Sequence, residues 1–329
     1  MTDSTLTSIE ICAGAGGQAI GLERAGFQHV AAIEIDMHAC ATLRDNRPQW
    51  NVLQKDLREF HATQFRGVDL LAGGVPCPPF SIAGKQLGQD DDRDLFPTAI
   101  RLVREAKPDA VMLENVPGFA TAKFAPYRQK LILQLERLGY QVDWQVLNAC
   151  NFGVPQLRPR FVMVALRPAV FPRFAWPEPI GTPPTVGEAL VDQMARSDWP
   201  GALAWAQRAG GIGPTLVGGS KLHGGPDLGP TRAKRAWLQL GVDARVLANE
   251  PPPRDFPVDG LPKLTVEMTA KIQGFPPEWR FAGGKTAQYR QIGNAFPPPV
   301  AAAVATAIRK ALLRQSRHTF ADVSTATQR

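Results

Sequence analysis

Residues 8–27 read SIEICAGAGGQAIGLERAGF, in which an apolar run of strand type breaks into glycines and then continues with helical spacing. Gly14, Gly16 and Ala19 satisfy G-x-G-x-x-[GA], and Glu34 follows the first glycine by 34 − 14 = 20 residues. Such glycines let backbone amides approach a ligand, and such an acid accepts hydrogen bonds from a ribose diol. The stretch therefore predicts a strand, a loop and a helix that bind an adenosine-bearing ligand, and an ordinary strand-to-helix turn is the alternative.

Strand-like and helix-like stretches alternate as far as Arg167. Between the strands lie DLFPTAIRLVREA (94–106) and YRQKLILQLERLGY (127–140), whose apolar residues recur at helical spacing. This alternation predicts an α/β fold with a doubly wound, Rossmann-like and mostly parallel sheet over residues 1–167. The strand candidates are 8–12, 29–35, 68–72, 109–113, 142–147 and 161–166.

The composition changes between residues 168 and 262. These 95 residues contain 15 prolines and 13 glycines, together with four of the seven tryptophans, so we expect a second, smaller and loop-rich domain. Loops on a rigid scaffold commonly carry recognition. Helical spacing returns in LTVEMTAKIQGFP (264–276), where Thr265 is a candidate N-cap and Gly274 a candidate stop. Residues 263–329 are expected to return to the first domain.

Bulk composition limits the classes of partner. Lys and Arg number 37 against 30 Asp and Glu, and the resulting charge of +7 is compatible with a polyanionic partner. Four cysteines without a C-x-x-C pair and five dispersed histidines predict neither a metal site nor a disulfide framework, and favour a reducing cytosolic setting. We expect no signal peptide and no membrane span, because no apolar stretch approaches about 18 residues.

Cys77 stands in LLAGGVPCPPFS (70–81), directly after an apolar strand candidate. Pro76, Pro78 and Pro79 stiffen its loop. A lone cysteine is usually a small buried hydrophobe. Here it lies at the carboxyl end of a strand, where open α/β sheets bind ligands, and this position favours a nucleophile.

An acid and two arginines follow at later strands. Glu114 and Asn115 end the strand of DAVMLENVPGF (109–119), at the same expected sheet edge as Cys77, and a carboxyl group against apolar surroundings can serve as a proton donor. Arg158 and Arg160, in NFGVPQLRPRFVMVAL (151–166), are two residues apart, so a strand would point both to one face to bind oxyanions or carbonyl oxygens. Structural salt bridging is the alternative. A thiolate, an acid, paired arginines and an adenosine ligand suit covalent attack on an electron-poor ring with group transfer.

These pieces together resemble the bacterial DNA (cytosine-5)-methyltransferases. The resemblance covers almost the whole chain in the order of that family: EICAGAGG, EID, KDL, GGVPCPPFS, ENV, QLRPR, a variable segment, LTVEMTAKIQGFP and QIGNAFPP. It implies S-adenosyl-L-methionine as cofactor and carbon 5 of a flipped-out cytosine as methyl acceptor. It also implies that Cys77 attacks the ring, Glu114 protonates it and Arg160 binds its carbonyl, with Arg158 and Asn115 in the same catalytic motifs.

The resemblance assigns further residues to the cofactor and to DNA. Cys12 stands where the family usually has Phe. The cofactor-binding residues so implied are Cys12, Ala13, Gly14, Gly16, Gly17, Glu34, Ile35, Asp56, Pro76 and Asn294. The residues so implied to contact DNA are Ser81 and Arg93 in a mobile loop, and Thr215, Leu216, Lys221, His223, Arg232, Lys234 and Arg235 in a target-recognition domain spanning 168–262.

The expected partner is double-stranded DNA, modified by a monomer in the bacterial cytoplasm, at the nucleoid. The enzyme is expected to act beside a restriction endonuclease that cuts the same site, or as an orphan. Three alternatives remain: an RNA cytosine-5 methyltransferase, a catalytically silent DNA-binding module, and a nicotinamide-dependent dehydrogenase. The presence of Cys77 and Glu114 argues against the silent module.

Overall fold

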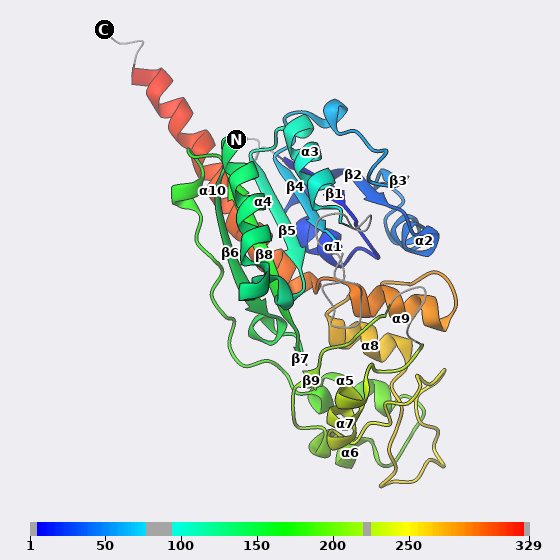
Figure 1. The fold of residues 1–329 in the computed structure, drawn as a ribbon. Coiled ribbons are helices and arrows are strands. Elements are labelled where there is room, and N and C mark those ends of the chain that lie inside the picture. Colours follow the sequence, from blue (N-terminus) through cyan, green and yellow to red (C-terminus); the bar gives the residue numbers. More distant parts are fainter. Residues whose placement is uncertain (1–4, 77–93, 220–224, 326–329) are drawn as a thin grey trace.

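The structure is a computed structural model that describes residues 5–76, 94–219 and 225–325. Its centre is a seven-stranded sheet in the order β3-β2-β1-β4-β5-β8-β6 (Figure 1). Neighbours from β3 to β5 run parallel, and β8 runs antiparallel to β5 and β6. The predicted α/β sheet is thereby confirmed. The strands of this sheet are β1 Leu6–Ile11, β2 Phe27–Glu34, β3 Val52–Gln54, β4 Leu70–Gly74, β5 Ala110–Asn115, β6 Gln141–Asn148 and β8 Pro159–Leu166.

Helices cover both faces of the sheet, which is why its central strands are almost continuously apolar. One face packs against α3 (Phe96–Ala106) and α4 (Ala125–Arg137), and the other against α1 (Gly17–Arg24) and α10 (Pro298–Thr325). The helix α2 (Met37–Asn46) follows β2. Short 3-10 helices lie at Thr63–Phe65, Pro117–Ala120, Ala122–Phe124, Ala149–Phe152 and Phe171–Arg173.

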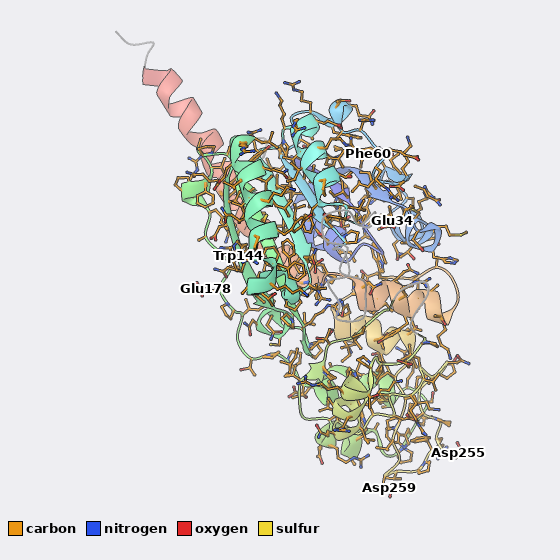
Figure 2. All side chains as sticks on the ribbon, in the orientation of Figure 1. Glu34, Phe60, Trp144, Glu178, Asp255 and Asp259 are labelled. Carbon is orange, nitrogen blue, oxygen red and sulfur yellow. The ribbon has the colours of Figure 1, made fainter. Side chains whose placement is uncertain are left out.

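Residues 170–176 still pack against the sheet and α10, and the segment that follows them forms a small domain beside one end of the sheet (Figure 1). Its regular elements are α5 (Val186–Met194), α6 (Ala202–Arg208), α7 (Thr231–Gln239) and β9 (Gly213–Pro214), which pairs in parallel with β7 (Gln156–Leu157). Three of the four tryptophans expected there, Trp199, Trp205 and Trp237, are buried and form its apolar centre. In Figure 2, Asp255 and Asp259 mark the end of this domain that is remote from the sheet.

The segment after Pro262 divides between the two parts of the molecule. The helix α8 (Val266–Gln273) packs on α5, and α9 (Lys285–Asn294) packs on α8, whereas α10 returns to the sheet. The predicted helix ends are confirmed, because the Thr265 hydroxyl accepts the Met268 amide and Gly274 has a φ of 87°. The helix α8 shares one apolar cluster with residues of the small domain and with residues of the first domain such as Leu43 and Trp50. Within the described ranges, no helix is both long and apolar enough to span a membrane.

Candidate active site

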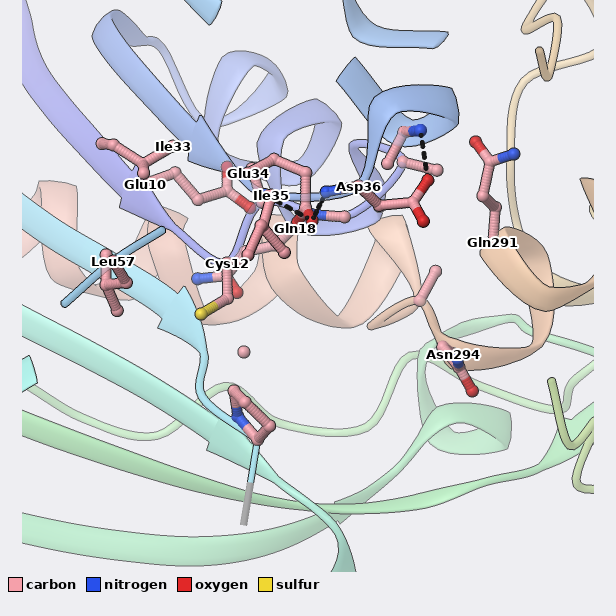
Figure 3. A pocket seen from close by; sticks show the side chains of 18 of the residues that line it. Glu10, Cys12, Gln18, Ile33, Glu34, Ile35, Asp36, Leu57, Gln291 and Asn294 are labelled. Atoms are coloured by element: carbon pink, nitrogen blue, oxygen red, sulfur yellow. Dashed lines mark hydrogen bonds between the residues drawn. The ribbon is translucent and has the colours of Figure 1, made fainter. Parts of the chain in front are cut away.

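A single cavity of about 690 Å³ opens at the carboxyl ends of β1, β2, β4 and β5. Residues distant in sequence share its wall, because parallel strands end at the same edge of a sheet. The wall combines the glycine loop, the end of β2, residues 55–58, Pro76, Glu114 and residues 294–296. Figure 3 shows side chains from β1, β2 and α9 facing this space.

The glycine loop has the left-handed backbone that its sequence predicts. Gly14 and Gly16 have φ angles of 54° and 90°. A Cβ atom on Gly14 would meet open space, so the backbone there is accessible to a ligand. A Cβ atom on Gly16 would lie 2.8 Å from Trp279, and one on Gly17 would lie 2.3 Å from the Phe296 carbonyl oxygen. Gly14 therefore leaves room for a ligand, whereas Gly16 and Gly17 allow close packing.

The Glu34 carboxylate holds the loop in this shape. Its Oε2 accepts the Gly14 amide at 2.7 Å, and its Oε1 accepts the Ile35 and Asp36 amides at 2.8 Å each. Figure 3 shows this group between the loop and the start of α2. Each carboxylate oxygen can accept more than one hydrogen bond, so Glu34 can still bind a ribose diol.

The opposite part of the wall suits a flat apolar ring with a polar edge. Ile35 lines the cavity and is 59% exposed, so its apolar side chain is accessible to a ligand. Asp56 also lines it and forms an ion pair with Arg58, with 2.7 Å between Oδ2 and Nη2. Asn294 contributes from the end of α9, where its amide nitrogen donates to the Gly219 carbonyl at 3.1 Å.

The cavity wall carries charges of both signs. Among its described residues, Glu34, Asp36 and Asp56 stand against Lys55, Arg58 and Arg290, while burial raises the pKa values of Glu10 and Glu114. The fit to an adenosyl ligand rests on hydrogen bonding and shape, because Glu34 can accept from a ribose diol and the backbone at Gly14 faces open space. On these grounds the residues present fit S-adenosylmethionine.

Glu10 is a cavity residue that the sequence reasoning missed. Its side chain is 1% exposed, and neither of its carboxylate oxygens has a hydrogen-bond partner among the described residues. Burial, and then the nearby Glu34 carboxylate, raise its pKa well above the ordinary value. The available signal was an acid inside the otherwise apolar strand SIEI (8–11).

Cys12 is a thiol in the wall of the same cavity, where Figure 3 shows its sulfur pointing toward the open space. Its φ is 52°, which is rare for a residue with a side chain. Burial raises the pKa of this thiol, and the carboxylates of Glu34, Glu10 and Asp56 add to the shift. Cys12 therefore remains a neutral thiol at physiological pH.

Glu114 and Arg160 meet at the inner end of the cavity. Arg160 Nε lies 2.9 Å from Glu114 Oε1, and both residues are 9% exposed. The antiparallel pairing of β5 with β8 brings them together. Burial raises the pKa of Glu114 although the charge of Arg160 acts in the opposite direction. The carboxyl group is thus suited to hold and donate a proton.

Asn115 ties this pair to the loop that carries Cys77. Its amide nitrogen donates to the Val75 carbonyl at 2.8 Å, and its amide oxygen accepts the Val116 amide. Gly74 pairs with Glu114 across β4 and β5, and Pro76 lines the cavity. Pro76, the residue before Cys77, therefore lies at the same edge of the sheet as the predicted acid Glu114.

Arg158 does not share the position of Arg160. It is fully buried, and its guanidinium donates to three backbone carbonyls, those of Leu216, Gly293 and Ala295. The expectation that both arginines point to one face is wrong, because β8 begins at Pro159 and the strand alternation does not reach Arg158. Of the two, only Arg160 contacts Glu114 through an ion pair.

The predicted DNA contacts divide into three groups. Ser81, Arg93, Lys221 and His223 lie outside the described residues, as does the predicted nucleophile Cys77. Leu216 is fully buried, so its side chain packs in the core and the expected DNA contact is corrected; Thr215 donates its hydroxyl to the Leu157 carbonyl. On α7, Arg232 and Arg235 are exposed, whereas Lys234 forms an ion pair with Asp227 at 3.1 Å.

Comparison with known proteins gives consistent matches. The family model described as C-5 cytosine-specific DNA methylase matches residues 6–201 and 229–310. The chain is 57% identical over 312 residues to the type II methyltransferase M.NaeI of Lentzea aerocolonigenes, a match that covers 94% of this chain and 76% of that protein. It is 52% identical over 323 residues to the type II methyltransferase M.NgoMIV of Neisseria gonorrhoeae, covering 94% and 99%.

A solved structure shares the fold. It is the crystal structure of a putative DNA modification methyltransferase encoded within an Escherichia coli prophage. It superposes with a TM-score of 0.63 at 22% identity, covering 93% of this chain and 99% of that one. At this identity the likeness concerns the arrangement of helices and strands.

Proposed function

Because the chain belongs to the C-5 cytosine-specific DNA methylase family, we propose that it methylates a cytosine within a short specific sequence of double-stranded DNA through a covalent bond to Cys77. Family membership makes it a DNA cytosine-5 methyltransferase with S-adenosylmethionine as methyl donor. The observation that carries the proposed mechanism is the 2.9 Å contact between Arg160 and Glu114, because Glu114 lines the same cavity as the glycine loop.

The chemistry requires activation of the cytosine ring, because its carbon 5 is a poor nucleophile. The Cys77 thiolate adds to carbon 6, and a carbon–sulfur bond forms. Glu114 donates its proton to ring nitrogen N3, and Arg160 binds the O2 carbonyl, so that the electrons displaced by the thiolate accumulate at carbon 5. After methylation, loss of the carbon 5 proton to a base expels the Cys77 thiolate, and N3 returns its proton to Glu114, which restores the aromatic ring.

The cofactor residues are assigned on the same basis. The backbone amides around Gly14 and Gly17 would hold the methionine part, as would Asn294. Glu34 would accept the ribose hydroxyls, Asp56 the adenine amino group, and Ile35 would pack on the adenine ring. When bound, S-adenosylmethionine supplies an electrophilic methyl group. The exposed Ile35 side chain and the open space beside Gly14 support this assignment.

The target base must leave the helix to reach Glu114, because that carboxyl group is buried at the end of a cavity. Flipping a base costs a few kcal/mol. Contacts between the protein and the DNA around the flipped base must offset this cost. We assign such contacts to Thr215, Arg232 and Arg235, and to Ser81, Arg93, Lys221 and His223 outside the described residues. The small domain so engaged is the proposed target-recognition domain. The names of the type II relatives lead us to propose a role in a restriction–modification system or as an orphan enzyme, acting as a monomer on nucleoid DNA.

The decisive experiment maps 5-methylcytosine at base resolution in DNA and RNA from cells that express the protein. A recurring short methylated DNA motif is expected, and cells expressing Cys77→Ala should lack it. Methylated RNA with unmodified DNA would overturn the substrate assignment and support the RNA methyltransferase alternative. A motif that persists with Cys77→Ala would overturn the covalent mechanism alone.

A further inference from the structure

Four segments that are distant in the sequence meet at one buried junction between the sheet and the small domain. They are residues 156–158 before β8, residues 213–219 around and after β9, the end of α8, and residues 293–295 at the end of α9. Figure 1 shows α8, α9, β7 and β9 converging in this region. Most of the side chains at its centre are polar, so the junction depends on specific hydrogen bonds.

Arg158 is the centre of the junction. Its Nη1 donates to the Leu216 carbonyl at 2.7 Å, and its Nη2 donates to the carbonyls of Gly293 and Ala295 at 2.7 and 2.9 Å. The side chain is fully buried. A buried guanidinium is costly unless it is bonded, and its planar fork suits two acceptors that lie side by side. One arginine therefore fixes Leu216 relative to the end of α9.

Gln156 and Gln273 extend these contacts into a network. Gln156 Oε1 accepts the Leu216 amide at 2.8 Å, and its Nε2 donates to Gln273 Oε1 at 2.7 Å. Gln273 Nε2 in turn donates to the Ala295 carbonyl at 2.6 Å. Both glutamines are fully buried. The amide and the carbonyl of Leu216 are thus both bonded to side chains of the junction.

The same backbone forms part of the cofactor cavity. Gly219, Asn294 and Ala295 line it, and the Asn294 side chain bonds the Gly219 carbonyl. Gly218 and Gly293 pack so closely that a Cβ atom on Gly293 would lie 2.4 Å from the Gly218 nitrogen. A displacement of this cavity wall would therefore move residues 215–219 with it.

We propose that Arg158 is a positioning residue that couples occupancy of the cofactor cavity to the conformation of residues 213–219, and through them to DNA binding. The coupling rests on the proposed function, which assigns the cavity to S-adenosylmethionine and the small domain to DNA. A ligand in the cavity restricts the motion of residues 294–296. Because Arg158 bonds both the end of α9 and Leu216, this restriction extends to Leu216. Residues 213–219, which include Thr215, then hold the conformation that binds DNA. Linkage then requires that DNA tighten cofactor binding by the same factor.

Arg158→Lys is the informative variant. Lysine keeps the positive charge but concentrates its donors on one nitrogen, so it cannot bridge the acceptors that the guanidinium fork reaches. Arg167→Lys is the matched control, because Arg167 lies just beyond the other end of β8 and also donates to a backbone carbonyl, that of Leu138, at 3.0 Å. The control loses an arginine–carbonyl bond without touching the junction.

Hydrogen–deuterium exchange with S-adenosylhomocysteine as the probe tests the coupling without DNA. In the wild type and in Arg167→Lys, the probe should slow exchange of peptides covering residues 31–36 and residues 213–219. In Arg158→Lys it should protect 31–36 and leave 213–219 unprotected. Equal protection of 213–219 in Arg158→Lys would overturn the proposal, as would a wild type in which only 31–36 responds. No protection of 31–36 in the wild type would overturn the cavity assignment, and the coupling with it.

Two measurements extend the test. The dissociation constant of S-adenosylhomocysteine, with and without a duplex that carries the mapped methylation motif, should change by about fivefold or more in the wild type. This ratio should approach one in Arg158→Lys, and a ratio equal to that of the wild type would contradict the proposal. Thr215→Val serves if Arg158→Lys does not fold, because it removes only the hydroxyl contact to Leu157 at the edge of the junction. It should reduce the protection of 213–219, and unchanged protection would count against the coupling.

Discussion

Arg160 Nε lies 2.9 Å from Glu114 Oε1, across the antiparallel pairing of β5 with β8. Burial raises the pKa of Glu114 in spite of this neighbouring charge. An arginine that fixes the position of a carboxyl group whose pKa is raised by burial suits an acid that must act on a ring nitrogen. The pair therefore combines a fixed geometry with a carboxyl group that takes up a proton more readily than an exposed one.

Glu114→Gln should lower the rate of methyl transfer by about 10²- to 10⁴-fold, because the amide keeps the shape of the acid but cannot donate a proton to N3. The measurement is incorporation of labelled methyl groups into DNA under single-turnover conditions. Glu136→Gln, on the exposed side of α4, is the control and should react like the wild type. A Glu114→Gln rate within a few-fold of the wild type would remove Glu114 from the proton transfer.

Cys77→Ala should abolish methyl transfer and leave DNA binding largely intact, because the thiolate forms the bond to carbon 6 but contributes little to the affinity for DNA. Cys150→Ala, a half-exposed cysteine remote from the cavity wall, should retain activity. A duplex with 5-fluorocytosine at the target should trap the wild type covalently, since fluorine does not leave as a cation. A trapped complex with Cys77→Ala would contradict the assignment of the nucleophile.

Gly14→Ala and Gly17→Ala should fail in different ways. On Gly17 the methyl group would lie 2.3 Å from the Phe296 carbonyl, so we expect a loss of stability of about 1–3 kcal/mol. On Gly14 it would meet open space in the cavity, so weaker binding of S-adenosylhomocysteine should add to the cost of about 1–2 kcal/mol for the left-handed backbone. Calorimetric titration of the folded proteins separates the two variants, because both should lower the thermal stability. Equal binding by Gly14→Ala and the wild type would place the ligand elsewhere.

Glu10→Gln should change the pH dependence of stability. The raised pKa of Glu10 means that the folded protein keeps a proton which the unfolded chain releases above about pH 4.5. Its contribution to the free energy of unfolding is therefore complete below pH 4.5 and is lost as the pH rises through the raised pKa. As the pH rises from 4.5 through the raised pKa, the wild type loses this contribution and Glu10→Gln has none to lose. The melting temperature of Glu10→Gln minus that of the wild type should therefore increase as the pH rises. A constant difference between pH 4.5 and 8 would contradict this account, and Glu136→Gln serves as the control.

Much of the sheet could be predicted because its strands are buried on both faces. Residues 110–113 and 161–166 are continuously apolar, and they lie within β5 and β8. The two-residue strands β7 and β9 could not be recognised, since two residues carry no periodicity. The helices of the small domain were hidden among frequent prolines and glycines, and tertiary packing around Trp205 and Trp237 determines them.

The candidate site was predictable where a residue lies at the carboxyl end of a strand, as Glu34 and Glu114 do. Arg158 was misjudged because its neighbours come from residues 216 and 293–295, and such contacts leave no local pattern in the sequence. Leu216 was misjudged for a similar reason, since its burial depends on the small-domain core. Glu10 was overlooked because it is distinguished by a buried carboxyl group without hydrogen-bond partners, and neither burial nor missing partners can be read from the sequence.

The glycine loop depends on residues that the ribosome adds much later. Trp279 donates to the Ala15 carbonyl across 264 residues of chain, and Gly17 packs against the Phe296 carbonyl. The helix α10 then covers α1 so closely that Gly21 contacts Ala301. The loop can therefore reach its final shape only after residues 296–312 have left the exit tunnel. A nascent chain would therefore carry Cys77 without a completed glycine loop until these later residues have emerged.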